Sequence, residues 1–501
     1  MSLARVYSRA GVGVHAPEVI VEVHVGGGLP RISMVGLPET AVREAKDRVK
    51  AALLNAGFRI PPSHITISLT PADLPKAGGR FDLPIALGIL AATGQVNDVQ
   101  FDKFEFIGEL SLGGGINPVP GVLPVALGAK RTGRGLVVPA SNGPEAALAK
   151  APDQYQADSL LSVVSWLNGR AQLARVTSKD EAVSSFGRDL RDVYGQHQAR
   201  RALEVAAAGA HNILFAGPPG TGKTMLASRL PSILPPLSEG EALDTATVAS
   251  ISHKGLNIDR WRTRSFRAPH HSASSAAIVG GGSRPRPGEI SLAHHGVLFL
   301  DELPEFKRNV LEVLREPMES GRVIISRAGN MAEFPARFQL VAAMNPCPCG
   351  YFGDKSGRCM CTSEQVQRYR AKISGPLLDR IDLQVEIARP QSLHYHQRGK
   401  VPENSTAVRQ RVEAARNLQL DRAGVPNAQL DSSGVRRHCS PGRNRSFLDE
   451  AANAMGLSAR GWQRVLKVAR TVADLEANNA IRREHLAEAL AYRGFAGQKT
   501  Q

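Results

Sequence analysis

The sequence has few aromatic residues and no long apolar run, and each shortage excludes a class of protein. Phe, Trp and Tyr together make up 5% of the 501 residues, so aromatic base-stacking platforms are not expected to dominate contacts with nucleic acid. No apolar stretch approaches the roughly 20 residues of a membrane-spanning helix. Residues 1–14 also lack the apolar block of a signal peptide. We therefore expect a cytoplasmic protein that makes no membrane contact.

Acidic residues are in the minority, with 46 Asp and Glu against 62 Lys and Arg, and the formal net charge is +16. Such an excess favours anionic partners, which include nucleic acids, nucleotides and anionic membrane surfaces. Residues 391–501 hold 18 Lys and Arg against 10 Asp and Glu, so half of the net charge lies in this C-terminal segment. Hydrophobic residues make up 42%, which is sufficient for globular cores in about three domains.

The pattern of apolar residues divides the chain into four parts and predicts an α/β protein. In residues 1–176, strand-type runs at 19–27, 64–72, 104–112 and 135–141 alternate with runs of helical periodicity at 39–57 and 82–94. Residues 177–190 are polar and typical of a linker. Residues 191–390 form a second α/β region, and residues 391–501 have a helical pattern without a clear strand.

The strongest motif lies in residues 211–230, where an apolar strand-type run is followed by a glycine-rich loop and a helix-type run. Glycine allows backbone N–H groups to close around phosphate oxygens, to which a helix N-terminus adds partial positive charge. The lysine of the motif, Lys223, would reach the β- and γ-phosphates, and Thr224 would hold Mg²⁺. The predicted ATP-binding residues are Gly217, Pro218, Pro219, Gly220, Thr221, Gly222, Lys223 and Thr224.

Two further strand-type runs end in polar residues of the kind an ATP-hydrolysing site needs. Residues 297–300 are apolar and are followed by Asp301 and Glu302. Asp301 would hold Mg²⁺, and Glu302 would polarise the attacking water, since ligands bind at the carboxyl ends of parallel strands. Residues 338–344 lead to Asn345, whose amide could touch the γ-phosphate or the water. Asn before Pro is also common in turns, which is the alternative interpretation.

Four of only five cysteines lie within 15 residues, at Cys347, Cys349, Cys359 and Cys361. Four thiolates separated by a Gly-containing spacer can complete a tetrahedral Zn²⁺ site, and four ligands would leave no open position for catalysis. We therefore favour structural zinc over the alternative of four free thiols in a loop. Cys439 has no partner in the sequence and is expected to be inert.

The motifs at 217–224, 298–303, 342–346, 374–383 and 457–471 occur in the order found in a known family. They resemble the AAA+ ATPases of the magnesium-chelatase-like ComM/YifB family, and the resemblance extends over nearly the whole chain. It implies a homo-hexameric ring with each ATP site between neighbouring subunits. Arg380 is then similar to the arginine finger that enters a neighbour's site, and Arg460 to the sensor arginine of a C-terminal helical lid. Gln196 matches a position that contributes to the adenine pocket; for either arginine, the alternative is a surface salt bridge.

Residues 264–295, between the two ATP motifs, resemble the insertion in the second helix of this clade. The resemblance implies that Arg267, Arg284 and Arg286 lie on a loop that projects into a central pore. A second hairpin, within residues 322–341, would carry Arg327 toward the same pore.

Two pairs of adjacent histidines, His270–His271 and His294–His295, also lie in this insertion and could suggest a metal. Adjacent side chains are expected to diverge, so we favour packing or phosphate contact.

Residues 69–94 and 108–139 resemble the Lon-protease-like domain of the same family. The proteases use a Ser–Lys pair, and a pair needs both members to generate a nucleophile. In our alignment Arg80 occupies the serine position and Leu123 the lysine position. We therefore expect a domain without protease activity, one that binds DNA or a partner or organises the ring.

These features leave three functions to compare. The first is an ATP-driven DNA motor, which the resemblance identifies as a hexameric branch-migration helicase of natural transformation and recombination. Its partners would be single-stranded or branched DNA and recombination proteins. The second is a magnesium-chelatase-type motor for metal insertion into a tetrapyrrole. The third is an ATP-dependent protease, against which the missing Ser–Lys pair argues.

Overall fold

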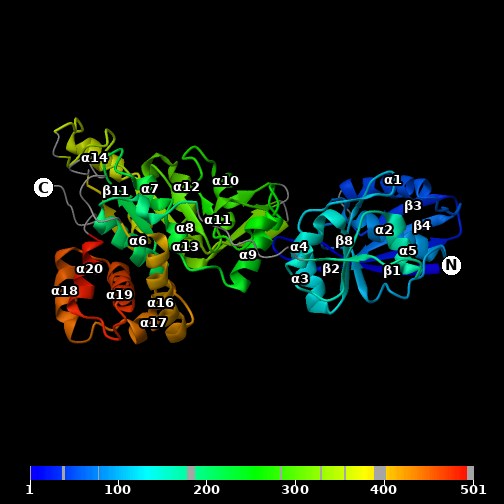
Figure 1. Ribbon diagram of the computed structural model, residues 1–501. Coiled ribbons are helices and arrows are strands. Elements are labelled where there is room, and N and C mark those ends of the chain that lie inside the picture. The colour runs from blue at the N-terminus through cyan, green and yellow to red at the C-terminus, as the bar shows by residue number, and fades with distance from the viewer. Residues whose placement is uncertain are drawn as a thin grey trace. The chain divides into compact units, whose positions relative to one another are not determined.

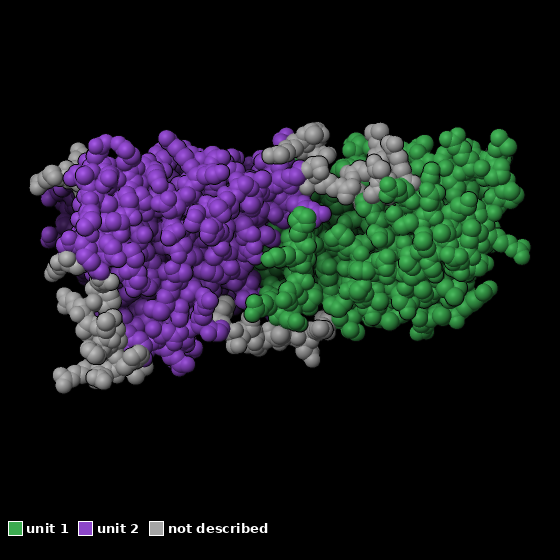
Figure 2. All heavy atoms as spheres, turned by 90° about the horizontal axis from the view of Figure 1, so that it is seen from above, with its two compact units in different colours: residues 1–183, 239–261, 328–334 green, residues 184–238, 262–327, 335–501 purple. Residues whose placement is uncertain are grey.

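The computed structural model describes residues 2–36, 40–76, 78–177, 187–282, 285–327, 330–354, 357–388 and 402–493. The chain forms two compact units, each of which is described by itself (Figures 1 and 2). Unit 1, green in Figure 2, contains residues 1–183, 239–261 and 328–334, and unit 2 contains residues 184–238, 262–327 and 335–501. Within the described ranges no helix has the length and hydropathy to cross a membrane.

Unit 1 is built on an eight-stranded mixed sheet in the order β10-β9-β8-β5-β1-β2-β4-β3. Strands β2 and β4 alternate buried and half-exposed residues, because successive side chains of a strand point to opposite faces. Val21 of β2 lies opposite Val6 of β1 and Leu69 of β4 in antiparallel register. The strands are β1 (Ser2–Arg9), β2 (Glu18–Gly26), β3 (Arg31–Val35), β4 (His64–Thr70), β5 (Phe104–Phe106), β8 (Gly135–Pro139), β9 (Gln154–Ala157) and β10 (Ala174–Arg175), with a small hairpin of β6 (Glu109–Leu110) and β7 (Ile116–Asn117).

Helices cover the sheet of unit 1 from two sides. One apolar core contains α1 (Thr40–Asn55), α2 (Asp82–Ala92), α5 (Leu160–Leu167) and Val137, which confirms the helices predicted at 39–57 and 82–94. The neighbours of Val137 on β8 pack instead in a second core with α3 (Val122–Thr132) and α4 (Gly143–Ala147). Helix α2 lies so close to β2 that a Cβ atom at Gly88 would come within 2.6 Å of Val23.

Helix α9 (Glu239–Ser250) also belongs to unit 1, although the sequence boundaries placed it inside one continuous region at 191–390. Ala246 of α9 is buried in the core of α3 and α4. The carbonyl of Ser250 accepts a hydrogen bond from the N–H of Gly121 at 3.2 Å, and its hydroxyl donates to Glu145. The apolar pattern of α9 does not reveal which core it joins.

Unit 2 contains a five-stranded parallel sheet in the order β12-β15-β18-β11-β19. Its strands are β11 (Ile213–Ala216), β12 (Phe266–Arg267), β15 (Val297–Leu300), β18 (Gln339–Met344) and β19 (Leu383–Glu386). Every residue of β11, β15 and β18 is buried, which explains their continuous apolar sequences. Their carboxyl ends meet at one edge of the sheet, where the predicted site residues follow.

Helices surround this sheet and continue into a C-terminal helical region. The helices of this unit up to residue 388 are α6 (His197–Gly209), α7 (Lys223–Ala227), α8 (Leu230–Ile233), α10 (Ser275–Val279), α11 (Glu289–Leu292), α12 (Arg308–Val313), α13 (Pro317–Ser320), α14 (Ser363–Arg370) and α15 (Gly375–Leu378). Its short strands are β13 (Gly280–Gly281), β14 (Arg286–Pro287) and β16 (Arg322–Arg327), whereas β17 (Asn330–Pro335) belongs to unit 1 through Phe334. Residues 402–493 are helical where described, with α16 (Ser405–Ala423), α17 (Ser432–His438), α18 (Arg445–Ala454), α19 (Ala459–Leu475) and α20 (Arg483–Ala491). Helices α16 and α19 lie beside α6 (Figure 1). Buried apolar residues of the C-terminal helices share one core with β11 and α6.

Candidate nucleotide-binding site

The predicted phosphate loop joins β11 to α7 at the carboxyl edge of the sheet in unit 2. Gly220 and Gly222 have φ of +76° and +83°, a conformation that glycine adopts without steric cost. Gly217 has no space for a side chain, because a Cβ atom there would collide with the carbonyl oxygen of Ile387. These glycines let the backbone turn back on itself before Lys223 begins the helix.

Lys223 is buried at the centre of this loop. Its Nζ donates hydrogen bonds to the carbonyl oxygens of Gly217 at 2.6 Å and Pro218 at 2.9 Å, and to Oδ1 of Asn345 at 3.1 Å. Burial lowers the pKa of Lys223, while the nearby carboxylates of Asp301 and Glu302 act in the opposite direction. A bound phosphate could replace the loop carbonyls as acceptor for this ammonium group.

The two acidic residues follow β15, as predicted. Thr224 Oγ1 donates to Oδ2 of Asp301 at 2.6 Å, so the two predicted Mg²⁺ ligands are adjacent. Glu302 has a positive φ of +53°, which is uncommon for a residue with a side chain and typical of constrained positions at functional sites. Oε2 of Glu302 lies 3.3 Å from Nδ1 of His271, and the exposed carboxylate can therefore be held by a neutral or a charged imidazole.

Asn345 follows β18 beside Lys223, and a residue that the sequence does not reveal lies near it. Tyr369, on α14, is buried, and the backbone of Asn345 is close enough to act on its phenol. Burial, with smaller effects from Glu305, Glu302 and the Cys347 sulfur, raises the pKa of Tyr369 to about 12. A neutral phenol is thus held next to the predicted γ-phosphate sensor. A single tyrosine in a helical pattern carries no signal of such a role.

Gln196 contacts the phosphate loop from the segment before α6. Its Nε2 donates to the carbonyl of Thr221 at 2.6 Å. Its Oε1 is buried and finds no hydrogen-bond partner within the described ranges, which leaves an acceptor that a base or ribose group could satisfy. The backbone of Gln196 has φ of +46°. The predicted contribution to an adenine pocket stays a prediction, and its contact with the loop supports it.

Arg380 lies at the opposite edge of the sheet from the phosphate loop of its own chain. Its carbonyl accepts from Asn212, the residue before β11, whereas the loop follows β11. Its guanidinium is mostly buried, donates to the carbonyl of Pro376 at 2.7 Å and pairs with Glu319 at 2.7 Å. A surface salt bridge is therefore not an adequate description of this residue.

Arg460 is exposed in the first turn of α19. This turn lies beside the segment that contains Arg380, because Oγ of Ser458 donates a hydrogen bond to Asp379 at 3.4 Å. Asp382 fixes the two segments together through Arg464 of α19 and through His211, whose Nδ1 is 3.0 Å away. Burial alone would raise the pKa of Asp382. Arg464 and His211 outweigh this effect and hold the pKa of Asp382 well below its usual range. The structure thus groups the two predicted arginines away from the phosphate loop of their own chain.

The insertion between the two ATP motifs differs from the prediction in one residue. Arg267 does not lie on a projecting loop: it is on β12, and Nε and one terminal nitrogen each donate to Glu289 at 2.6 Å. The predicted position of Arg267 on a projecting loop is therefore wrong, and its pair with Glu289 instead fixes α11 to the sheet. Arg286 lies on β14 of the β13–β14 hairpin, while Arg284 and the side chain of Arg327 lie outside the described residues.

The histidine pairs also correct an assumption. Adjacent rings do not diverge, because the ring centroids are 4.1 Å apart in His270–His271 and 4.0 Å apart in His294–His295. His294 is buried, its Nδ1 accepts from the N–H of Arg337 at 3.0 Å, and burial lowers its pKa to about 3. His271 instead contacts Glu302.

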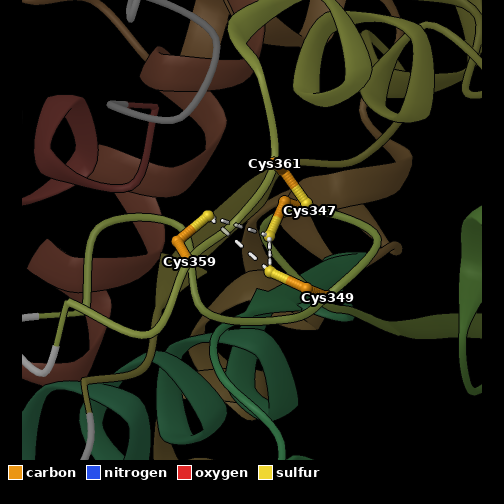
Figure 3. Close-up of side chains that lie close together, drawn as sticks. All are labelled: Cys347, Cys349, Cys359 and Cys361. Atoms are coloured by element: carbon orange, nitrogen blue, oxygen red, sulfur yellow. Dashed lines mark hydrogen bonds between the residues drawn. The ribbon is translucent and has the colours of Figure 1, made fainter.

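The four clustered cysteines converge in space from two segments (Figure 3). Sulfur–sulfur distances are 3.3 Å for Cys347–Cys349, 3.8 Å for Cys347–Cys359 and 3.6 Å for Cys349–Cys359, and all four sulfurs lie within 4.8 Å of one another. Four ligands at about 2.3 Å from a tetrahedral zinc would be separated by about 3.8 Å. A disulfide needs about 2.05 Å, and the cysteines are free.

Backbone N–H groups favour the thiolate form at two of the four cysteines, Cys347 and Cys349, whereas the pKa values of Cys359 and Cys361 are raised by hydrogen bonds from the other sulfurs. The N–H of Phe352 donates to the sulfur of Cys347 at 3.3 Å. A backbone hydrogen bond from Tyr351 lowers the pKa of Cys349 to about 6. Donors aimed at sulfur favour the deprotonated form that binds metals. The four residues can hold a metal ion because their sulfurs converge, and a set of four sulfur ligands fits zinc.

Comparison with known proteins agrees with this geometry. Family models described as "Magnesium chelatase, subunit ChlI", "Subunit ChlI of Mg-chelatase" and "Magnesium chelatase, subunit ChlI C-terminal" match residues 189–395, 21–142 and 402–493. Competence protein ComM of Haemophilus influenzae is 51% identical, over 99% of this chain and 98% of its own. YifB of Escherichia coli is 49% identical with the same coverage. The magnesium-chelatase 38 kDa subunit of Rhodobacter capsulatus is 26% identical, over 59% of this chain and 83% of its own.

The 51% identity with ComM thus extends over 99% of the chain. The phosphate loop lies within residues 189–395, which the first of these family models matches. The chain belongs to the ComM/YifB family of magnesium-chelatase-like ATPases.

Proposed function

We propose that this protein is an ATP-driven DNA motor, a homo-hexameric branch-migration helicase that acts in natural transformation and homologous recombination. The observation that carries the proposal is the 51% identity, along nearly the full chain, to a protein named for competence. ATP with Mg²⁺ would bind at the phosphate loop, where Lys223, Thr224 and Asp301 are already adjacent. The basic C-terminal region and single-stranded or branched DNA have complementary charge.

Two alternatives have less support. The magnesium-chelatase subunits match only 59% of this chain at 26% identity or less, so a tetrapyrrole-metallating motor would leave the remainder without a role. A protease would need a nucleophile with its base. Of the two positions that our alignment gives to such a pair, Leu123 is a fully buried apolar residue, and Arg80 donates to the carbonyl of Pro120 at 2.7 Å. An inactive Lon-protease-like fold for unit 1 is part of the proposal.

DNA binding supplies the first test. We expect forked and four-way DNA to bind at low salt and to stimulate ATP hydrolysis severalfold. If six or more phosphates are contacted, affinity should fall by about 10³-fold between 50 and 200 mM salt, since counterions are released on binding. Fluorescence anisotropy, coupled-enzyme ATPase and branch-migration assays would measure these effects. Casein degradation or porphyrin metallation without any DNA response would contradict the proposal and favour one of the alternatives.

A structural zinc ion at Cys347, Cys349, Cys359 and Cys361 is a second part of the proposal. We expect the purified protein to contain about one zinc per chain by elemental mass spectrometry, and the double substitution Cys359→Ser, Cys361→Ser to lose nearly all of it. Removing two of four thiolates leaves too few ligands for a closed site.

The matched control for the zinc prediction is Cys439→Ser. Cys439 is fully buried in the apolar core that it shares with α19, and it is not one of the four clustered cysteines. This variant should keep its zinc. Equal zinc content in the double variant and in the control would refute the metal assignment.

A further inference from the structure

The loop that carries the four cysteines packs directly against the phosphate loop. Gly350, between the second and third cysteines, is buried and has φ of +86°. A Cβ atom at this position would come within 2.7 Å of Cγ and Cδ of Pro219, and within 3.8 Å of Cγ of Asn345. Gly350 therefore lies between a residue of the phosphate loop and the amide that accepts a hydrogen bond from Lys223.

The position of Gly350 depends on the cysteine cluster. Its N–H donates to the carbonyl of Cys347 at 3.0 Å, so it closes a tight turn that contains the first two cysteines. Cys347 is fully buried, two residues after Asn345. On the other side, Nε of Arg370 donates to the carbonyl of Pro346 at 3.2 Å. The turn is thus held between the sulfur cluster and α14, whose Tyr369 also lies near Asn345.

From these contacts we infer that the four-cysteine loop is part of the nucleotide site, and that a thiophilic divalent metal bound there sets the affinity of the phosphate loop for nucleotide. With the metal bound, the turn holds Gly350 against Pro219 and Asn345. Without it, the bonds that would join Cys347 and Cys349 to Cys359 and Cys361 through the metal are lost, and the two segments of the loop are no longer tied together. The turn then relaxes and Pro219 and Asn345 lose their packing partner. This inference rests on nucleotide binding at the phosphate loop, and it adds a metal requirement to that binding.

Two glycines in the same loop provide a matched test. Gly353 has φ of +81°, close to that of Gly350, but a Cβ atom there would meet no described residue within 4 Å. Gly350→Ala and Gly353→Ala therefore introduce a similar backbone strain, and only Gly350→Ala displaces Pro219. We expect Gly350→Ala to weaken binding of a fluorescent ATP analogue at least about tenfold while keeping its metal. Gly353→Ala should bind nucleotide as the wild type does.

Metal removal supplies the second arm. The zinc content and the nucleotide dissociation constant would be measured on the same samples of wild type, chelator-treated wild type, and the Cys359→Ser, Cys361→Ser variant. We expect both metal-depleted samples to bind nucleotide at least about tenfold more weakly, and added zinc to restore the chelated wild type but not the variant.

Two outcomes would overturn the inference: equal nucleotide affinity in Gly350→Ala and Gly353→Ala, or unchanged affinity after loss of the metal. Either result with normal nucleotide binding in the wild type would leave the ATPase assignment intact. A wild type that binds no nucleotide would overturn both.

Discussion

Substitution of Glu302 by Gln is expected to stop ATP turnover and to leave ATP binding intact. Glu302 follows the strand that presents Asp301 to Thr224, and its carboxylate is exposed at the edge where the γ-phosphate would lie. Removing a general base costs 10²–10⁴-fold in rate as an order of magnitude. Binding depends on Lys223 and the loop glycines, which the substitution does not change. Single-turnover hydrolysis and binding of a fluorescent ATP analogue would separate the two effects.

Lys223→Ala is the comparison variant for this prediction, because it should lose nucleotide binding whereas Glu302→Gln should lose only turnover. Loss of the ammonium group should weaken nucleotide binding itself, because Lys223 is the cation at the centre of the phosphate loop. Glu302→Gln should accumulate ATP and, if the protein is a DNA motor, remain bound to DNA. Turnover in Glu302→Gln within a few-fold of the wild type would show that another group polarises the water. His271, which contacts Glu302, would then be the next residue to substitute.

The nucleotide site could be predicted from sequence because its parts are local. A four-residue apolar strand followed by a glycine-rich loop specifies the conformation of Lys223 and Thr224 without any tertiary information. Asp301 and Asn345 each follow a continuous apolar run, and parallel strands bring such residues to one edge. The cysteine cluster was also predictable, since its four ligands lie close together in sequence.

Other parts of the site depend on contacts that no local pattern encodes. Tyr369 reaches Asn345 only because α14 packs back on the end of β18, and Gly350 reaches Pro219 only because the cysteine loop folds over the phosphate loop. The family resemblance predicts that Arg267 lies on a pore loop, whereas its bidentate pair with Glu289 is a tertiary contact that the sequence pattern does not encode. The position of helix α9 also depends on tertiary contacts, because its apolar residues do not specify which of the two units' cores it joins.

Arg380→Ala is expected to reduce ATP turnover by on the order of 10³-fold or more, the effect of removing an arginine finger. The residue cannot serve its own phosphate loop in the arrangement observed. The carbonyl of Arg380 accepts a hydrogen bond from Asn212, which comes just before β11, whereas the phosphate loop comes just after β11. The four residues of this strand, at about 3.3 Å each, separate Arg380 from the loop. If Arg380 acts in catalysis, it must act on another subunit. The ion pair with the exposed carboxylate of Glu319 would then position it. ATP binding, which does not need the finger, should be retained.

Mixing two inactive variants distinguishes this role from a structural one. Arg380→Ala keeps an intact phosphate loop, and Lys223→Ala keeps an intact Arg380. In a mixed ring, a subunit with Arg380→Ala can receive the arginine of a neighbour with Lys223→Ala, so one complete site forms at that interface. We expect the mixture to recover ATP hydrolysis that neither variant has alone, in proportion to the fraction of such interfaces. If Arg380 only stabilised its own subunit through Glu319, the intact neighbour could not replace it, and the mixture would stay as inactive as its components. Recovery therefore requires a site shared between subunits, while inactivity of every mixture would refute the arginine-finger assignment.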